Sequence, residues 1–191
     1  RELGGPIASS RVLIIDMASL LLWRGVFGSR NRLGAWSEGV RSLTTKELSE
    51  YKGRIYDTDS FCTIDVRWGD QDAMNHVNNA KYFTYIEQAR CEWWERSKVI
   101  PGLSASTVFD VAPILASTEC KFKKPVEFPD RLTVGISVEL LDKARGDLRH
   151  HYFIHSAAQG TVVAEATADI VAYAYKDKKR CAVPDEWVVS P

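Results

Sequence analysis

Two carboxylates lie in a short polar turn, and a helix is predicted to begin a few residues later. Asp70 and Asp72 fall within residues 69–75, and the helix starts near Asn78 and Asn79. The first N–H groups of a helix have no partner inside it and carry partial positive charge, so they can stabilise a carbonyl oxygen that becomes an oxyanion. A nearby carboxylate could attack the acyl carbon or take a proton from water. A carboxylate this close to a helix start could therefore carry out acyl transfer. Asp is also common as a plain turn or cap residue, however. The spacing alone does not indicate which of the two carboxylates would act.

The residues on either side of the turn predict a strand before it and a long helix after it. Residues 61–68 alternate in polarity, which is typical of a strand with Cys62, Ile64, Val66 and Trp68 on one face. Residues 78–97 form the predicted helix, whose apolar stripe is Tyr82, Ile86, Ala89 and Trp93, widened by Phe83 and Trp94. A stripe this broad and aromatic is expected of a helix that a sheet wraps around.

Four further strands are predicted after the helix. They cover residues 110–123, 130–141, 148–157 and 161–175, and the turns between them contain Pro129-Asp130, Arg145-Gly146-Asp147 and Gln159-Gly160. These turns suit antiparallel neighbours. The sequence therefore predicts an α+β domain in which a five-stranded antiparallel sheet wraps one long central helix.

Two sequence blocks resemble a known family. Residues 76–90, H-V-N-N-A-K-Y-F-T-Y-I-E-Q-A-R, and residues 122–126, F-K-K-P-V, are similar to the acyl-CoA thioesterases of the 4-hydroxybenzoyl-CoA thioesterase family, including their long-chain bacterial members. The resemblance covers about residues 61–175. It implies a hotdog fold and hydrolysis of a fatty acyl-CoA or related thioester, with coenzyme A as part of the substrate and no separate cofactor. Plant acyl-carrier-protein thioesterases are also similar, but their D-x-N-x-H pattern is broken here by Met74 and Asn75.

The resemblance also assigns roles to individual residues. It implies that Asp72 is the catalytic carboxylate, that Asp70 is a turn residue, and that the backbone N–H of Asn79 is the oxyanion donor. Some hotdog thioesterases use a carboxylate on the central helix instead, which here would be Glu87; its alternative is a pairing with Arg90. His76 and Asn78 would shape the turn beside the substrate.

The family places basic residues for coenzyme A at the end of the third strand and the turn after it. Here that segment offers Lys143, Arg145 and Arg149, which could meet the phosphates. Charged residues at a hairpin are more often simply solvated. The neighbouring His150 and His151 lie on one strand and are expected to point to opposite faces.

The segment before the predicted domain suggests a second function. We divide the chain into an N-terminal helical extension (1–58), a hotdog domain (59–176) and a C-terminal tail (177–191). The extension has an apolar run at residues 12–23, too short to span a membrane, and a capping box of Thr44 and Glu47 that predicts a short helix. The alternative to an enzyme is a catalytically silent subunit of a larger protein assembly that docks through residues 1–58. For the enzyme, the family implies a homodimer or higher oligomer.

Composition excludes some partners. The 25 Lys and Arg balance the 25 Asp and Glu, so no net charge draws the chain to nucleic acid. The four cysteines lack metal-ligand or paired spacing, so neither a metal site nor a disulfide is expected. Residues 1–40 are rich in Arg and Ser and poor in acids, which is typical of organelle-targeted proteins; we expect the mitochondrion, with the cytoplasm as the alternative.

Overall fold

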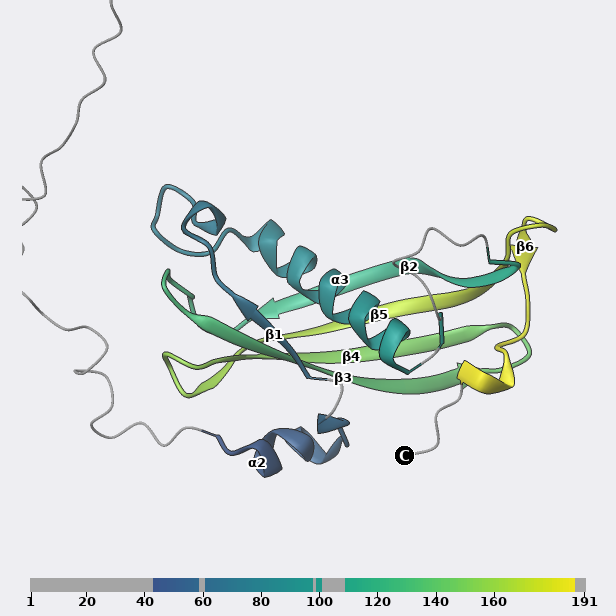
Figure 1. Cartoon of the computed structure of the whole chain (residues 1–191), viewed down its shortest axis with the longest axis horizontal. Coiled ribbons are helices and arrows are strands. Elements are labelled where there is room, and N and C mark those ends of the chain that lie inside the picture. The colour runs from purple at the N-terminus through teal and green to yellow at the C-terminus, as the bar shows by residue number, and fades with distance from the viewer. Residues whose placement is uncertain (1–42, 59–60, 98, 101–108, 188–191) are drawn as a thin grey trace, which may run out of the picture. The chain divides into compact units, whose positions relative to one another are not determined.

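The fold is one antiparallel sheet with a long helix across one face (Figure 1). The computed structural model describes residues 43–58, 61–97, 99–100 and 109–187. The strands are β1 (Cys62–Asp65), β2 (Val111–Phe122), β3 (Arg131–Asp142), β4 (Asp147–Ser156), β5 (Thr161–Ala174) and the two-residue β6 (Lys179–Arg180). They lie in the order β1-β3-β4-β5-β2, with β6 paired to β5. The helix and the strands from β2 to β5 begin and end within two residues of their predicted limits, which confirms the expected fold.

Helix α3 (Asn79–Arg96) forms the main core with the sheet. Its buried side chains are Tyr82, Tyr85, Ile86, Ala89, Arg90, Trp93 and Trp94. They pack against the inward residues of the strands, among them Leu132, Ile136 and Ile170. This is the predicted stripe, with Phe83 only half-buried. Because the sheet covers about three turns of this helix face, from Tyr82 to Trp94, the start of α3 is held in a fixed place.

A second, smaller core lies on the opposite face of the sheet. The short helix α2 (Thr45–Ser49) has the predicted capping box of Thr44 and Glu47 and is followed by the 3-10 turn η2 (Tyr51–Gly53). Phe153 of β4 is fully buried here against the rings of Tyr51, Tyr56 and Phe61. Gly135 of β3 makes room for this ring, because a Cβ there would lie 2.2 Å from Phe153 Cε1.

This second core places the described part of the extension on the sheet domain. The described residues 43–58 belong to one compact unit with the sheet, although the sequence pattern assigns them to the N-terminal extension. The physical reason is the aromatic cluster around Phe153, whose members Tyr51 and Tyr56 come from the extension and pack only once the sheet has formed. The apolar run at residues 12–23 lies outside the described residues, so its role as a docking segment stays a prediction.

The first strand is shorter than predicted. β1 ends at Asp65, opposite Arg131 where β3 begins, and Trp68 starts the 3-10 turn η4 (Trp68–Asp70) with 75% of its surface exposed. The alternating pattern of residues 61–68 therefore outlasts the strand, and Trp68 does not share the buried face of Cys62, Ile64 and Val66. The sheet also has one strand more than predicted, β6, and the chain then forms the 3-10 turn η6 (Asp185–Trp187).

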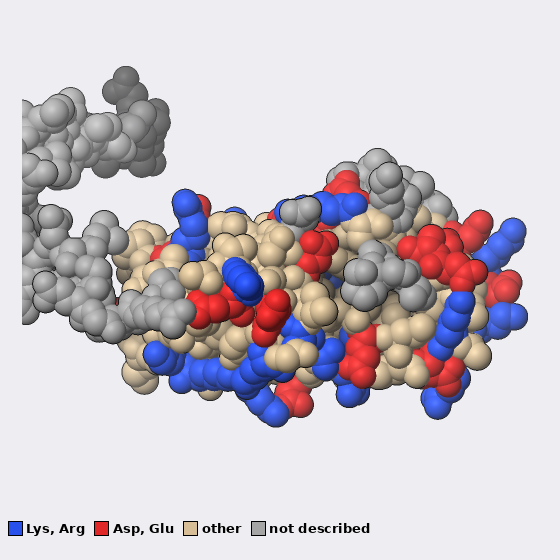
Figure 2. All heavy atoms as spheres, turned by 90° about the horizontal axis from the view of Figure 1, so that it is seen from below, with Lys and Arg blue, Asp and Glu red and all other residues tan. Residues whose placement is uncertain are grey.

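The surface carries both signs of charge. Figure 2 shows Lys and Arg side chains next to Asp and Glu side chains over one face of the molecule. Many of the described Lys and Arg side chains pair with a carboxylate of the same chain. Among the described residues, no helix has the length and hydropathy needed to cross a membrane. The four cysteines are free thiols.

Candidate active site

The turn before α3 holds Asp72 in a fixed position. Its backbone N–H donates to the carbonyl of His76 at 2.8 Å, and its Oδ1 accepts the N–H of Met74 at 2.8 Å. Asn75 completes the turn with a φ of 62°, a conformation that Asn tolerates better than most residues. The second carboxylate oxygen of Asp72 makes no hydrogen bond within the described part of the chain, and the residue is exposed. That oxygen is therefore free to act on a substrate.

The start of α3 presents an unpaired N–H group beside this turn. Asn78 is the N-cap, and its Oδ1 accepts the N–H of Ala80 at 2.9 Å. The N–H of Asn78 itself donates to the carbonyl of Asp70 at 2.9 Å. Asn79, the first helical residue, has no intrahelical acceptor and donates to none of the described residues. Its N–H group therefore has the properties required of an oxyanion donor.

Asp70 is a structural residue of the turn, as the resemblance implied. It is buried, and its Oδ2 accepts the hydroxyl of Tyr85 at 2.8 Å and the N–H of Arg67 at 3.0 Å. Lys81 lies 3.3 Å from its Oδ1. Burial alone would raise the pKa of Asp70, but these hydrogen bonds outweigh it and hold the pKa below its usual value. Both carboxylate oxygens of Asp70 are engaged by its own chain, which leaves Asp72 as the carboxylate available for chemistry.

A groove of about 360 Å³ joins the two sequence blocks. We call it the Asp72 groove. Asp72, Val77, Asn79 and Tyr82 line one side, and Phe122, Lys123, Lys124 and Pro125 line the other. The N–H of Val77 donates to the carbonyl of Val126 at 2.7 Å, which ties the two blocks together beside the groove. A carboxylate, an open helix start and an aromatic-basic wall thus surround one space.

The arrangement matches a known family of proteins. A profile of the thioesterase-like superfamily matches residues 66–189, about two thirds of the chain, and includes the whole Asp72 groove. The chain belongs to this superfamily. This confirms the family suggested by the two blocks, the hotdog fold and the expected class of enzyme, a thioester hydrolase.

Individual proteins are similar to the chain over the same region. The long-chain acyl-CoA thioesterase FadM of Escherichia coli is 28% identical over 123 residues, which are 64% of this chain and 89% of that protein. A candidate thioesterase of Pseudomonas aeruginosa is 26% identical with a TM-score of 0.58, over 66% of this chain and 93% of the other. A 1,4-dihydroxy-2-naphthoyl-CoA thioesterase of Synechocystis, 20% identical with a TM-score of 0.57 over 66% of this chain and 90% of its own, shares the fold.

Neither Glu87 nor His76 lines the Asp72 groove. Glu87 is absent from the Asp72 groove and lines a second one with Arg90, from whose Nη2 its Oε1 lies 4.0 Å away. His76 lies in the turn, where its carbonyl accepts from Asp72 and its half-exposed ring is 4.0 Å from Glu127. Asn78 serves as the helix cap. The structure therefore brings Asp72 and Asn79 together and leaves Glu87 about two helical turns away.

The residues expected for coenzyme A lie at the far end of the sheet. Lys143 pairs with Asp185, and Arg145 Nε lies 3.4 Å from Asp147 Oδ2. Val171, opposite Asp147, is seven residues along β5 from Ala164, the partner of Phe122, a distance of about 24 Å. These cations and the Asp72 groove of the same chain lie at opposite ends of the sheet.

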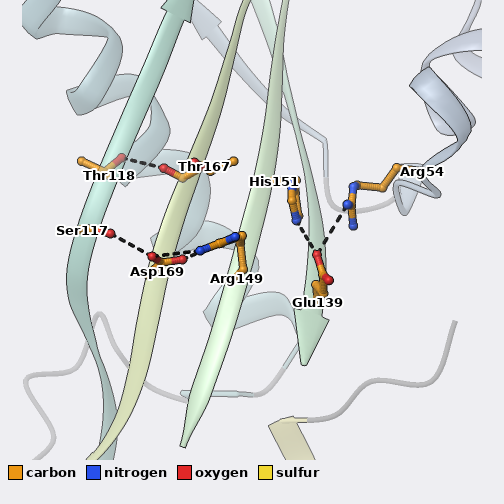
Figure 3. A network of polar contacts seen from close by, with 8 residues as sticks. All are labelled: Arg54, Ser117, Thr118, Glu139, Arg149, His151, Thr167 and Asp169. Atoms are coloured by element: carbon orange, nitrogen blue, oxygen red, sulfur yellow. Dashed lines mark hydrogen bonds and ion pairs between the residues drawn. The ribbon is translucent and has the colours of Figure 1, made fainter. Parts of the chain in front are cut away.

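Arg149 is paired on the other face of the sheet. Its Nε donates to Asp169 at 2.6 Å, and Asp169 also accepts the hydroxyl of Ser117 (Figure 3). His151, two residues on, projects from the same face and contacts Glu139 at 2.8 Å. His150 lies on the α3 side and is fully buried, which confirms that the two histidines point to opposite faces.

Sequence reasoning assigned no site role to six of the eight residues that line the Asp72 groove, nor to one buried cation. Tyr82 and the side chains of Phe122 and Lys124 line the Asp72 groove, although the second block had been recognised only as a family signature. Arg90 is buried in α3, where it had been considered only as a partner of Glu87. Its spacing was a usable signal, since Arg90 follows Ile86 by four residues on the apolar stripe.

Proposed function

We propose that the chain hydrolyses a fatty acyl-CoA or a related thioester to the free acid and the thiol, with Asp72 as the catalytic carboxylate. The observation that carries this is the shared groove, which is lined both by Asp72, with its free carboxylate oxygen, and by Asn79, with its free backbone N–H. The similarity to a long-chain acyl-CoA thioesterase supports a fatty acyl group.

The reaction needs little beyond these two groups. The carbonyl oxygen of the thioester accepts a hydrogen bond from the Asn79 N–H, which stabilises the negative charge as the carbonyl carbon is attacked. In one route Asp72 takes a proton from water while the water oxygen bonds to that carbon; in the other its oxygen attacks and forms a mixed anhydride that water then cleaves. In both, the C–S bond breaks, the thiolate leaves and takes a proton, and the net consumption is one water.

The wall opposite Asp72 suits the rest of the substrate. Lys124 lines the groove and pairs with no carboxylate among the described residues, so it is available for a phosphate of coenzyme A. Lys123 is already held by Glu165. Because Lys143, Arg145 and Arg149 lie away from the groove and are paired within their own chain, Lys124 is a better candidate for phosphate binding than any of them.

We further propose a homodimer formed through β2. This strand is an edge of the sheet, is 12 residues long and exposes Leu115 and Phe122. A long edge strand with unpaired backbone groups and exposed apolar side chains is a template for pairing with another strand. Both grooves described for this chain touch β2, so a second copy paired there would lie beside them.

The test is thiol release from acyl-CoAs of several chain lengths by the wild type and by Asp72→Asn. The amide can still accept the N–H of Met74, so the turn is retained while the carboxylate is lost. We expect turnover to fall about a thousandfold, or about 4 kcal/mol of transition-state stabilisation. Asp177→Asn is the control, since Asp177 is exposed and lies outside the groove.

One result would contradict the proposal. If wild type and Asp72→Asn are equally inert on every thioester, the chain is not a hydrolase that uses Asp72. The alternative of a silent subunit would then be tested by its size in native extracts, where a complex much larger than a dimer would support docking through residues 1–58.

A further inference from the structure

Arg90 is a buried cation without a matched anion. Its side chain is 6% exposed, and its Nε is buried with no hydrogen-bond partner in the described part of the chain. Its nearest carboxylate is Glu87, 4.0 Å from Nη2, and that side chain is 66% exposed. Removing a guanidinium from water is costly unless an opposite charge and hydrogen bonds compensate it. The compensation visible here is incomplete.

The other neighbours of Arg90 are neutral. The guanidinium lies 5.4 Å from the ring centroid of Trp94. His150 Nδ1 lies 3.2 Å from the hydroxyl of Tyr152, and both are buried on the strand beneath. Burial, with the charge of Arg90, lowers the pKa of His150 to about 3. Burial raises the pKa of Tyr152 to about 12, against the opposing effects of the Arg90 charge and of a hydrogen bond between the Arg90 side chain and the Tyr152 hydroxyl. Neither side chain supplies a negative charge at neutral pH.

Arg90 also lines a second space, which we call the Arg90 groove. It has a volume of about 160 Å³ and is lined by Phe83, Thr84, Ile86, Glu87, Arg90, Leu115 and Thr118. A cavity of about this volume can hold a molecule the size of benzene. Apart from Glu87 and Arg90 the lining is uncharged, so the site suits a short apolar segment that ends in a charged or polar group.

The Arg90 groove lies farther along the same two elements that line the Asp72 groove, and we call the line where these elements meet the α3–β2 seam. Both are formed by α3 and β2. From Asn79 to Arg90 the helix rises about 16 Å, and from Phe122 to Thr118 the strand covers about 13 Å in the same direction. An acyl group whose thioester lies at Asn79 can therefore extend along the seam toward Arg90.

We infer that Arg90 recognises a carboxylate at the far end of the acyl group, so that the substrate class is the CoA thioester of an α,ω-dicarboxylic acid. This inference rests on the proposed function and deepens it. The planar guanidinium matches a carboxylate through two parallel hydrogen bonds, which Lys or a neutral residue cannot reproduce. The exposed Glu87 can turn away to solvent when the substrate carboxylate enters.

The experiment compares paired substrates. Straight-chain acyl-CoAs and ω-carboxyacyl-CoAs of equal length are assayed with wild type, Arg90→Met and Arg90→Lys. Their lengths run from about eight to about sixteen carbons, which brackets the roughly 16 Å between Asn79 and Arg90. We expect wild type to favour the carboxylated member in kcat/KM, and Arg90→Met to reduce this preference about 10- to 100-fold, as expected for a lost charged hydrogen bond. Arg90→Lys should retain part of the preference.

Arg90→Met is expected to fold, because replacing an undercompensated buried charge with an apolar side chain of similar length is often neutral or stabilising. Arg96→Met is the matched control: Arg96 lies on the same helix, pairs with Glu92 at 2.5 Å and lines neither groove. It should leave the substrate preference unchanged.

Several outcomes would overturn the inference while the proposed function stands. One is hydrolysis that depends on Asp72 but shows the same ratio between paired substrates in wild type and Arg90→Met. Another is an equal loss on both substrates, which would indicate a structural role. A third is a change of oligomeric mass in Arg90→Met with the ratio intact, which would show that Arg90 pairs with a second copy.

A binding measurement decides the matter even if no thioester is cleaved. Calorimetric titration with free dicarboxylic and monocarboxylic acids of equal length needs no turnover. Tighter binding of the dicarboxylic acid by wild type, lost in Arg90→Met, would support the inference although the proposed function had failed. Equal affinities for the two acids in wild type would refute it.

Discussion

Asp70→Asn separates the structural carboxylate of the turn from the chemical one. In the wild type, Oδ2 of Asp70 accepts from Tyr85 Oη at 2.8 Å and from the Arg67 N–H at 3.0 Å, and Oδ1 faces Lys81 Nζ at 3.3 Å. An amide oxygen can replace one carboxylate oxygen, but its NH₂ group would then face the Lys81 ammonium. The substitution therefore loses one charge-assisted contact and weakens two hydrogen bonds.

The expected cost is about 2 kcal/mol, because hydrogen bonds to buried charged groups contribute about 1.5–3 kcal/mol. For a chain of this size that lowers Tm by about 4–8 °C. Asp65→Asn is the matched control: Asp65 pairs with Arg131 at 2.7 Å, but the two side chains are 70% and 65% exposed, so its loss should cost under about 1 kcal/mol. Thermal unfolding followed by circular dichroism at pH 7 measures both.

The difference in stability between wild type and Asp70→Asn is expected to depend on pH. The folded-state pKa of Asp70 is lowered, so its contribution to stability is present above the unfolded pKa of about 3.9 and is lost as pH falls below it. The gap in Tm between wild type and Asp70→Asn should therefore narrow below about pH 4. Thioester hydrolysis by the folded variant should stay within about tenfold of wild type, in contrast to Asp72→Asn. A Tm within 1 °C of wild type at pH 7, or a thousandfold loss of turnover, would refute this division of roles.

Two further predictions concern the outer face of the sheet. Gly135→Ala places a methyl group 2.2 Å from the fully buried ring of Phe153 and should lower the free energy of unfolding in urea by about 1–3 kcal/mol. In a Phe153→Leu background the same substitution should cost less, because the smaller side chain leaves room for the methyl group. If the effects of the two substitutions simply add, the close contact between residues 135 and 153 is contradicted. Burial alone would raise the pKa of Glu165, but hydrogen bonds from Lys123, Lys52 and Tyr51 lower it to about 2. The contribution of Glu165 to stability is thus present above about pH 4.3 and is lost toward pH 2. Glu165→Gln should therefore reduce the loss of stability between these pH values, as measured by circular dichroism. An unchanged loss would show that Glu165 does not hold residues 51 and 52 to the sheet.

The sequence alone determined the elements, because their signals are local. The helix over residues 79–96 and the strands after it follow from periodicity and from turn residues that act within a few positions. The carboxylate at Asp72 and the helix start at Asn79 were also predictable, since both belong to one short segment and one family motif.

Only the tertiary structure decided which side chains share a space. Asp70 and Asp72 lie two positions apart in the sequence. The side chains of Tyr85 and Lys81, which belong to α3, contact Asp70 and make it a structural residue, whereas Asp72 stays free. Trp68 fits the alternation of β1 yet is exposed, because the strand ends where its partner begins. Lys143, Arg145 and Arg149 match the family's basic segment but lie at the far end or on the other face of the sheet. The proposed role of Arg90 depends on its burial on α3 beside β2. Burial and charge compensation result from contacts between segments that are distant in the sequence, so no local pattern encodes them.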